Sequence, residues 1–205
     1  MIVMPSNNSR HQVHYWQGKY GGLAHLYSIG GKRGPYEHLP YALDNGRYPC
    51  FSNGKKWRED EYFDLLEFAK SSTLKPMWAL VPDSVGNPRG TLKEWDKWFP
   101  IVREYGFRCA FAVQDGHKVE DVPSEADVVF VGGTTGWKRS NIKNFCSNFD
   151  RVHVGRVNTL FWLNYCKECG AESCDGTGWF RGGPERWAPL EKFLIENQKG
   201  KNECE

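Results

Sequence analysis

Short apolar runs alternate along this chain with longer amphipathic segments. The runs predict strands at Leu23–Ile29, Tyr41–Asp44, Met77–Pro82, Cys109–Gln114, Val128–Val131, Val152–Val154 and Glu172–Cys174. Helical spacing of apolar residues predicts helices at Asp60–Lys70, Thr91–Tyr105, Lys138–Phe149, Val157–Cys169 and from about Glu185 to Asn197. Nearly all-apolar strands that alternate with helices are typical of a parallel sheet covered by helices.

Polar residues follow almost every predicted strand, which favours a barrel over an open sheet. An open sheet concentrates functional groups at one switch point, whereas a (β/α) barrel presents them after each strand. The polar strand ends are Asp44, Asp83, Gln114-Asp115, Thr134-Thr135, Arg156-Asn158 and Asp175. We therefore predict a compact α/β fold of the TIM type. Because 205 residues is short for eight units, we expect a trimmed unit or an irregular N-terminal strand.

The length and the 40% hydrophobic content are sufficient for one core, so we expect a single domain over residues 1–205 with a frayed polar tail at 198–205. No apolar run approaches the roughly 18 residues of a membrane span, and Met1–Tyr15 lacks a signal region. Seven cysteines, several of them inside apolar runs, fit reduced thiols. We expect a cytoplasmic protein with no membrane partner.

The net charge of +2 is too small to indicate nucleic-acid binding by itself, so the distribution of the charges matters. One basic segment interleaves aromatic residues, a composition that suits phosphates and stacked bases. It contains Arg47, Lys55, Lys56 and Arg58 with Tyr48, Phe51 and Trp57. A solvated loop with aromatic anchors explains it equally well. A second basic series follows the strand ends: Lys138, Arg139, Lys143, Arg156 and Arg181.

Asp44 and Asp175 are the strongest candidates for chemistry, because each ends a strand and is followed closely by glycine. Cleavage at an anomeric carbon needs one carboxylate to stabilise or capture the oxocarbenium-like centre and a second group to handle the proton of the leaving group. An ordinary turn role remains open, because Asp-Asn-Gly and Asp-Gly are common turn sequences.

Asp83 follows a strongly apolar strand, where a carboxylate can accept two hydrogen bonds from one edge of a guanine-like base. Gln114 would read the other edge, and Gly132-Gly133 would let a flat ring approach the backbone. A helix cap or a buried ion pair is the alternative for Asp83.

We predict no metal and no cofactor. Cys166 and Cys169 have a common zinc-ligand spacing, but they fall on a helix whereas Cys174 lies on a strand and the nearby His153 on another. No histidine pairs with a cysteine or serine in a recognisable nucleophile motif. The glycine-rich segment at Gly30–Gly34 lacks P-loop spacing.

Six segments, in order, resemble the tRNA-guanine transglycosylase superfamily, especially its short phage and bacterial relatives that act on DNA. They are Leu43-Asp44-Asn45-Gly46, Val81-Pro82-Asp83-Ser84-Val85-Gly86, Val113-Gln114-Asp115-Gly116, Val131-Gly132-Gly133-Thr134-Thr135-Gly136-Trp137-Lys138, His153-Val154-Gly155-Arg156-Val157-Asn158 and Ser173-Cys174-Asp175-Gly176-Thr177. Together they span most of the chain.

The resemblance implies a TIM-type barrel that breaks a base–sugar N-glycosidic bond. Asp175 matches the family's nucleophile and Asp44 its second catalytic aspartate. The family's base-recognising residues match Asp83, Gln114 and Gly133, and Arg181 resembles a family arginine that meets the polynucleotide. We further expect residues around the base at Asp115, Gly132, Arg156 and Asn158. From the basic composition we expect polynucleotide contacts at Arg47, Lys55, Lys56, Arg58 and Lys138.

Two departures from the family bear on the substrate. The tRNA enzymes carry a cysteine-histidine zinc subdomain after the nucleophile, whereas here only Cys204 and no histidine follow Asp175. They also carry a glycine pair where this chain has Gly46-Arg47-Tyr48. The sequence therefore favours DNA as the partner, with RNA as the alternative.

Two outcomes of bond cleavage remain open. If a 7-deazaguanine-type base enters the site, the enzyme is a transglycosylase. If water enters, it is a glycosylase that excises a modified base, for example a modified cytosine of phage DNA in antiviral defence, and leaves an abasic site. A base-binding module without catalysis is a third reading, against which the three matching aspartates argue.

Overall fold

The computed structural model describes residues 1–6, 11–30 and 35–202. Its strands are β1 (Ile2–Pro5), β2 (His25–Tyr27), β3 (Tyr41–Leu43), β4 (Ala79–Leu80), β5 (Cys109–Val113), β6 (Val128–Val131), β7 (Val152–Val154) and β8 (Ser173–Gly176). Its α-helices are α1 (His11–Tyr20), α2 (Arg47–Ser52), α3 (Glu59–Ser71), α4 (Pro88–Arg103), α5 (Thr135–Asn148), α6 (Leu160–Glu168) and α7 (Pro184–Asn202).

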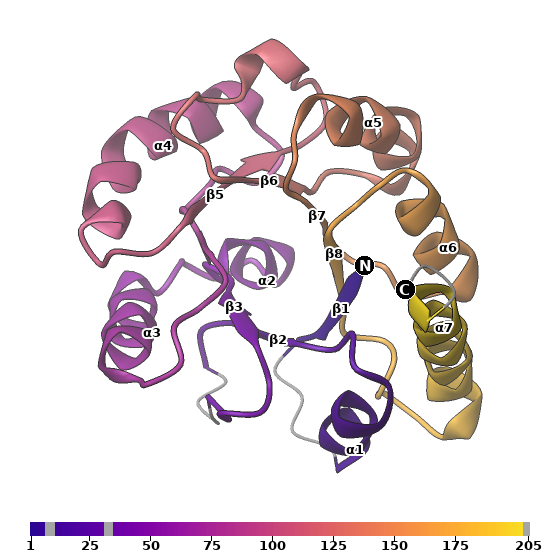
Figure 1. The fold of residues 1–205 in the computed structure, drawn as a ribbon. Helices are drawn as coiled ribbons and strands as arrows, with labels where there is room; N and C mark the ends of the chain where they lie inside the picture. Colours follow the sequence, from indigo (N-terminus) through magenta and orange to yellow (C-terminus); the bar gives the residue numbers. More distant parts are fainter. Residues whose placement is uncertain (7–10, 31–34, 203–205) are drawn as a thin grey trace.

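The eight strands form one parallel sheet that curls into a nearly closed barrel with helices around it (Figure 1). The strand order is β1-β8-β7-β6-β5-β4-β3-β2, and neighbouring strands in this order pair in parallel. Among the described residues, only single bridges close the ring between β1 and β2, Val3 to Leu23 and Ser6 to Leu26. The predicted TIM-type fold is confirmed.

Alternation along the strands divides the apolar residues between the inside of the barrel and the helices outside. The smaller cluster lies inside the barrel and is formed by residues that alternate with helix-facing ones. It contains Met4, Ala24, Leu26, Ala42, Trp78, Leu80, Ala110, Ala112 and Val128. The larger cluster joins the opposite strand faces to the helices, as with Val129 on β6 and Phe145 on α5. The large Trp78 side chain shares this cluster with the small side chains of Ala42 on β3 and of Ala110 and Ala112 on β5.

Three elements differ from the sequence prediction. β1 is a regular strand, paired over four residues with β8, although no strand was predicted there. The helix α1 was not predicted, and Arg47–Ser52 forms the helix α2 where a basic loop was expected. Pro49 is compatible with this helix because it lies in the first turn, where a backbone N–H has no helical partner.

Each predicted strand overlaps one observed strand. The helix α7 extends to Asn202, into the segment predicted as a frayed tail. In the described part of the chain, no helix has the length and apolar character needed to cross a membrane.

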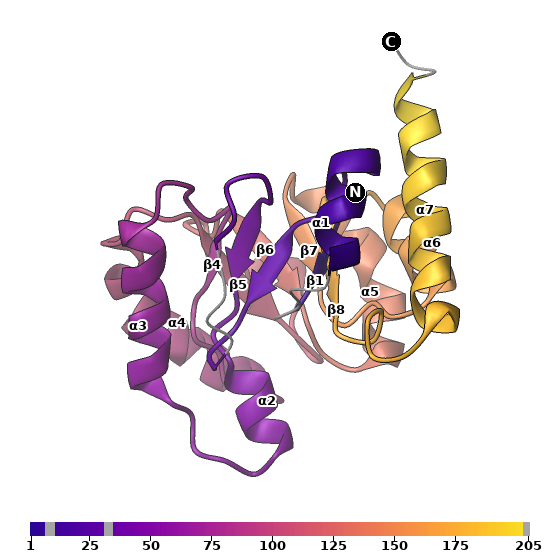
Figure 2. The ribbon, with the colours of Figure 1, turned by 90° about the horizontal axis from the view of Figure 1, so that it is seen from below.

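The helix α2 lies at the end of the barrel where the strands end, and in Figure 2 it lies below them. Gly46 begins this helix with φ of 73°, and a Cβ there would collide with Ile29. The tight turn directly after Asp44 therefore requires glycine.

Candidate active site

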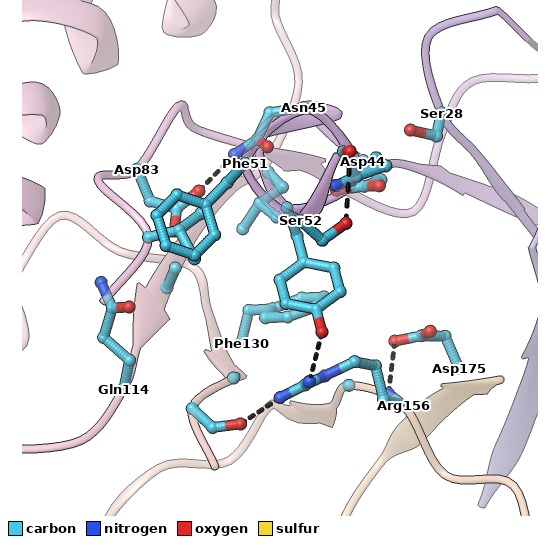
Figure 3. A pocket seen from close by; sticks show the side chains of 18 of the residues that line it. Ser28, Asp44, Asn45, Phe51, Ser52, Asp83, Gln114, Phe130, Arg156 and Asp175 are labelled. Atoms are coloured by element: carbon cyan, nitrogen blue, oxygen red, sulfur yellow. Dashed lines mark hydrogen bonds between the residues drawn. The ribbon is translucent and has the colours of Figure 1, made fainter. Parts of the chain in front are cut away.

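A cavity of about 890 Å³ opens at the carboxyl ends of the strands. Asp44, Asp83 and Asp175 line it, each from the end of a different strand, and Tyr48 and Phe51 line it from α2. In Figure 3, Asp44 and Asp175 lie toward one side of the cavity, whereas Asp83 and Gln114 lie toward the other. The barrel thus brings the three predicted aspartates into one cavity.

Asp44 carries a carboxyl group that holds its proton near neutral pH. Burial raises its pKa to about 7, and the nearby charge of Asp175 contributes in the same direction. Hydrogen bonds with the Ser28 hydroxyl and the Gly46 backbone act to lower the pKa but do not outweigh burial. Asp44 is therefore suited to give and take a proton close to physiological pH.

Asp175 is 6% exposed and receives its hydrogen bonds on one oxygen. Oδ1 lies 3.2 Å from Nε2 of His153 and accepts a bond of 3.3 Å from the backbone N–H of Arg156. Gly155 leaves room for this contact, because a Cβ there would lie 3.0 Å from the Phe130 ring and 3.4 Å from Asp175 Oδ1. Oδ2 accepts no hydrogen bond from the residues that the structure describes.

His153 is a site residue that the sequence analysis missed. It is 0% exposed, and its Nδ1 lies 2.8 Å from the Ser173 hydroxyl. The only available signal was its place between two valines on β7, since alternation turns a residue flanked by helix-facing valines toward the barrel interior.

Asp83 is held from the adjacent strand end by Asn45, which donates bonds of 3.0 Å to Asp83 Oδ1 and to the Val81 carbonyl oxygen. Burial raises the pKa of Asp83, while Asn45 and the charge of Arg47 act against this rise. Asn45 was not predicted as a site residue. Because Asn45 directly follows Asp44 in the chain, its bond to Asp83 fixes the position of Asp83 relative to Asp44.

Gln114 lies on the cavity wall, but its side-chain amide is engaged by the protein. Its Oε1 accepts a bond of 2.6 Å from the Gly86 N–H, and its Nε2 donates to the Ser84 carbonyl at 2.8 Å and to the Thr91 hydroxyl at 2.7 Å. A base would have to replace these bonds to be read by Gln114.

Asp115 connects the loops after β5 and β6. Its carboxylate accepts bonds of 2.6 Å from the Thr134 N–H and 2.7 Å from the Thr134 hydroxyl. Burial acts to raise its pKa, but the two Thr134 bonds, the backbone of Asp115 and the charge of Arg156 together outweigh burial, and the pKa is lowered. Gly133 has φ of 76°, and a Cβ there would collide with Asp115. Gly132 and Gly133 both line the cavity, which leaves their backbone accessible to a ligand.

Arg156 spans the cavity mouth. Its guanidinium donates to the Tyr48 hydroxyl at 2.8 Å and to the Gly133 carbonyl, and it lies 4.5 Å from the Tyr48 ring centre. Its φ of 60° is uncommon for a residue with a side chain. Asn158, two residues later, is outside the cavity lining and instead accepts a bond of 2.7 Å from the Gly178 N–H.

The basic residues predicted to bind nucleic acid separate into two groups. Lys138, predicted to bind nucleic acid, is 3% exposed and donates to the Gly155 carbonyl, so its ammonium group is engaged inside the protein. Burial lowers its pKa to about 8. Arg47 pairs with Glu94 at 2.6 Å and stacks on Trp57 at 3.9 Å, so its guanidinium is engaged as well.

Other basic residues remain accessible. Lys55 and Lys56 are exposed just beyond α2, and Arg58 pairs with Glu61 at 2.5 Å while keeping 51% of its side chain exposed. Arg181 is exposed and lines the cavity from the loop after β8. Of these accessible basic residues, Arg181 is the one in the cavity lining, and the three others follow α2 in the chain.

The cysteines do not form a metal site in the described residues. Cys166 lies on α6 and Cys174 on β8, and no group of three or more His, Cys, Asp or Glu side chains in the described part of the chain is arranged to hold a metal ion. The expected independence from metal stays a prediction.

No protein-family model and no curated protein matches this chain. The resemblance to the transglycosylase superfamily therefore stays a hypothesis from the motifs. What the structure adds is the barrel and the positions of the motif residues in it.

Proposed function

We propose that this barrel is an enzyme that breaks the base–sugar N-glycosidic bond of a nucleotide flipped out of DNA. The observation that carries the proposal is the convergence of Asp44 and Asp175 in one cavity, with the pKa of Asp44 at about 7. One group keeps a proton near neutral pH while the other offers an oxygen without a hydrogen-bond partner among the described residues. Glycosidic cleavage needs this division of roles.

Asp175 Oδ2 attacks C1′ of the sugar or stabilises the positive charge that develops there. The bond between C1′ and the base nitrogen breaks, its electron pair goes to the base, and Asp44 donates its proton to the leaving base. The resulting Asp44 carboxylate then takes a proton from the incoming nucleophile. The nucleophile bonds to C1′ and releases Asp175.

The opposite side of the cavity would hold the base. Asp83, fixed by Asn45, supplies an acceptor for ring N–H or amine groups, and Gly132 and Gly133 allow a flat ring to approach the backbone. Base flipping costs a few kcal/mol, which stacking on aromatic side chains offsets. Tyr48 and Phe51 of α2 are suited to this, whereas Trp179 is 1% exposed and donates to the Val157 carbonyl.

The nucleophile decides the biological outcome. The cavity volume allows a free 7-deazaguanine-type base to follow the leaving base, which gives exchange. Its rim supports a different candidate. Tyr48 contacts Arg156 across the mouth, and Tyr48 lies in the segment Gly46-Arg47-Tyr48, where the tRNA enzymes that this chain resembles carry a glycine pair. An altered rim favours an altered base, so the second candidate function is hydrolytic excision of a modified base.

The test incubates the protein with DNAs that contain guanine, 7-deazaguanine or modified cytosines, each with and without free base. Mass spectrometry measures the released base, and alkaline cleavage of the DNA reveals abasic sites. Release that requires free base and incorporates it indicates a transglycosylase. Release without free base, together with abasic sites, indicates a glycosylase. Absence of release from every DNA would contradict the proposal.

A further inference from the structure

A chain of three polar side chains leads from the cavity into the barrel interior. Asp175 contacts His153 at 3.2 Å, and His153 contacts Ser173 at 2.8 Å. Ser173 and Asp175 are two residues apart on β8 and face the same side of the sheet, and Ser173 pairs in register with His153 of β7. Of the three, only Asp175 lines the cavity.

The surroundings of His153 restrict the orientation of its ring. Phe130 stacks on the imidazole with 4.9 Å between ring centres, and Trp78 meets it edge-on at 4.8 Å. His153 and Ser173 are each 0% exposed. Buried polar groups cost free energy unless they are hydrogen-bonded, and each imidazole nitrogen here has one partner.

These contacts limit where the imidazole can carry its proton. An ionised carboxylate only accepts hydrogen bonds, so with Asp175 as an anion Nε2 of His153 carries the proton that faces it. The Nδ1 atom of a neutral ring is then an acceptor, and the Ser173 hydroxyl donates to it. His153 and the Arg156 N–H both donate to Oδ1, which leaves Oδ2 as the oxygen available to a ligand.

We propose that His153 is a positioning residue, which holds Asp175 as an anion with Oδ2 available to the anomeric carbon, and that Ser173 fixes the tautomer of the imidazole. This inference rests on the proposed function of Asp175. The charges of Asp44 and Lys138 also act on this carboxylate, so they must stay unchanged in any test. Neither His153 nor Ser173 touches the substrate.

The kinetic test compares three variants with the wild type at saturating DNA. Ser173→Ala removes the donor to Nδ1 and should lower kcat about tenfold with little change in KM, the size of effect typical of groups that orient a catalytic ligand. His153→Phe keeps an aromatic ring without a donor and should lower kcat about a hundredfold. His153→Gln can still present an N–H to Asp175 and should recover part of this loss.

Ser140→Ala is the matched control, because this serine on α5 is exposed and its hydroxyl donates to the Gly136 carbonyl of its own helix. Thermal melting of each variant separates lost activity from lost folding. Unchanged kcat in both Ser173→Ala and His153→Phe would overturn the inference.

A second measurement is independent of activity. Nitrogen NMR of the ¹⁵N-histidine-labelled protein without DNA should show His153 as a neutral ring protonated on Nε2, and Ser173→Ala should alter that signal. A ring protonated on Nδ1 alone in the wild type would overturn the inference. A ring protonated on Nε2 in a protein that releases no base would contradict the proposed function and still support the described geometry.

Discussion

Two carboxylates of the same residue type acquire different properties from their neighbours. Burial keeps water away from the Asp44 carboxylate and disfavours its charged form, so its pKa rises to about 7. Asp115 accepts two bonds from Thr134 at the protein surface, and its pKa falls. The difference between these aspartates lies in burial and hydrogen bonding, and the sequence alone shows neither.

The raised pKa of Asp44 predicts how stability changes with pH. Its folded pKa lies above its unfolded value, so its favourable contribution is complete below about pH 4 and is lost as pH rises through about 7. Asp44→Asn removes the cost of the buried charge and should raise the free energy of unfolding above pH 7 by up to about 4 kcal/mol. Urea unfolding of both proteins at pH 5 and pH 8 measures this difference.

Asp115→Asn is the matched control, with the opposite sign. A lowered folded pKa gives stability above the unfolded pKa that is lost as pH falls. Asp115→Asn should therefore destabilise the protein at pH 8 and have less effect in acid. If Asp44→Asn instead lowers the free energy of unfolding at pH 8, the charged carboxylate of Asp44 stabilises the fold and the prediction is wrong.

The titration of Asp44 should also appear in the dependence of activity on pH. If Asp44 donates the proton to the leaving base, the single-turnover rate should fall as pH rises through about 7. Asn cannot donate a proton in this way, so Asp44→Asn should be slow at every pH and should not show this fall in rate. Rate against pH between 5 and 9 is the measurement. A wild-type rate that is flat across this range would exclude Asp44 as the acid.

At the scale of the element, the helix α2 determines how the cavity mouth is built. Tyr48 and Phe51 line the mouth from this helix, and Lys55 and Lys56 follow it on the surface. Since phosphate contacts release counterions, Lys55→Ala with Lys56→Ala should weaken DNA binding and reduce the slope of log K against log salt by up to about 2.

The matched control for this double variant is Lys75→Ala. Lys75 is exposed before β4, at the opposite end of the barrel from the cavity. It should leave the salt slope unchanged. An unchanged slope in the double variant would place the phosphate path elsewhere, with Arg139 and Arg181 as the next residues to test.

Strands and helices were predictable from the sequence where a local run or spacing of apolar residues marks them. Val128–Val131 and Val152–Val154 have the bounds that apolar runs predicted, because a buried strand of a parallel sheet needs apolar residues on both faces. β1 was missed because four apolar residues at a chain terminus carry little periodicity. α2 was missed because Gly46, Pro49 and its charges resemble a loop.

Long-range pairing is what the sequence could not provide. The three aspartates were predictable because strand ends of a barrel converge. The pairing of Arg47 with Glu94 and the burial of Lys138 depend on how helices pack, so both residues were expected on the surface. The contact of His153 with Asp175 joins two neighbouring strands whose register no local pattern reveals.

At the scale of the whole molecule, closure of the barrel depends on β1. In the part of the chain that the structure describes, this strand pairs with β8 over four residues but meets the β2 side of the ring only through single bridges. Met4 of β1 is 0% exposed in the interior cluster. Met4→Ala should therefore cost about 2 to 5 kcal/mol of unfolding free energy, because it leaves a cavity inside the barrel.

Met4→Leu conserves most of the volume and should cost less than about 1.5 kcal/mol. Urea unfolding of the two variants measures the difference. Equal stability of Met4→Ala and wild type would show that β1 contributes little to the closed barrel.

The central claim is cleavage of a base–sugar bond through Asp175. The most direct measurement is base release from guanine, 7-deazaguanine and modified-cytosine DNAs by wild type and by Asp175→Asn, with equal folding checked by thermal melting. We predict release from at least one DNA by the wild type and a rate at least about a thousandfold lower in Asp175→Asn. Equal release by both proteins, or no release by the wild type from any of these DNAs, would contradict this account.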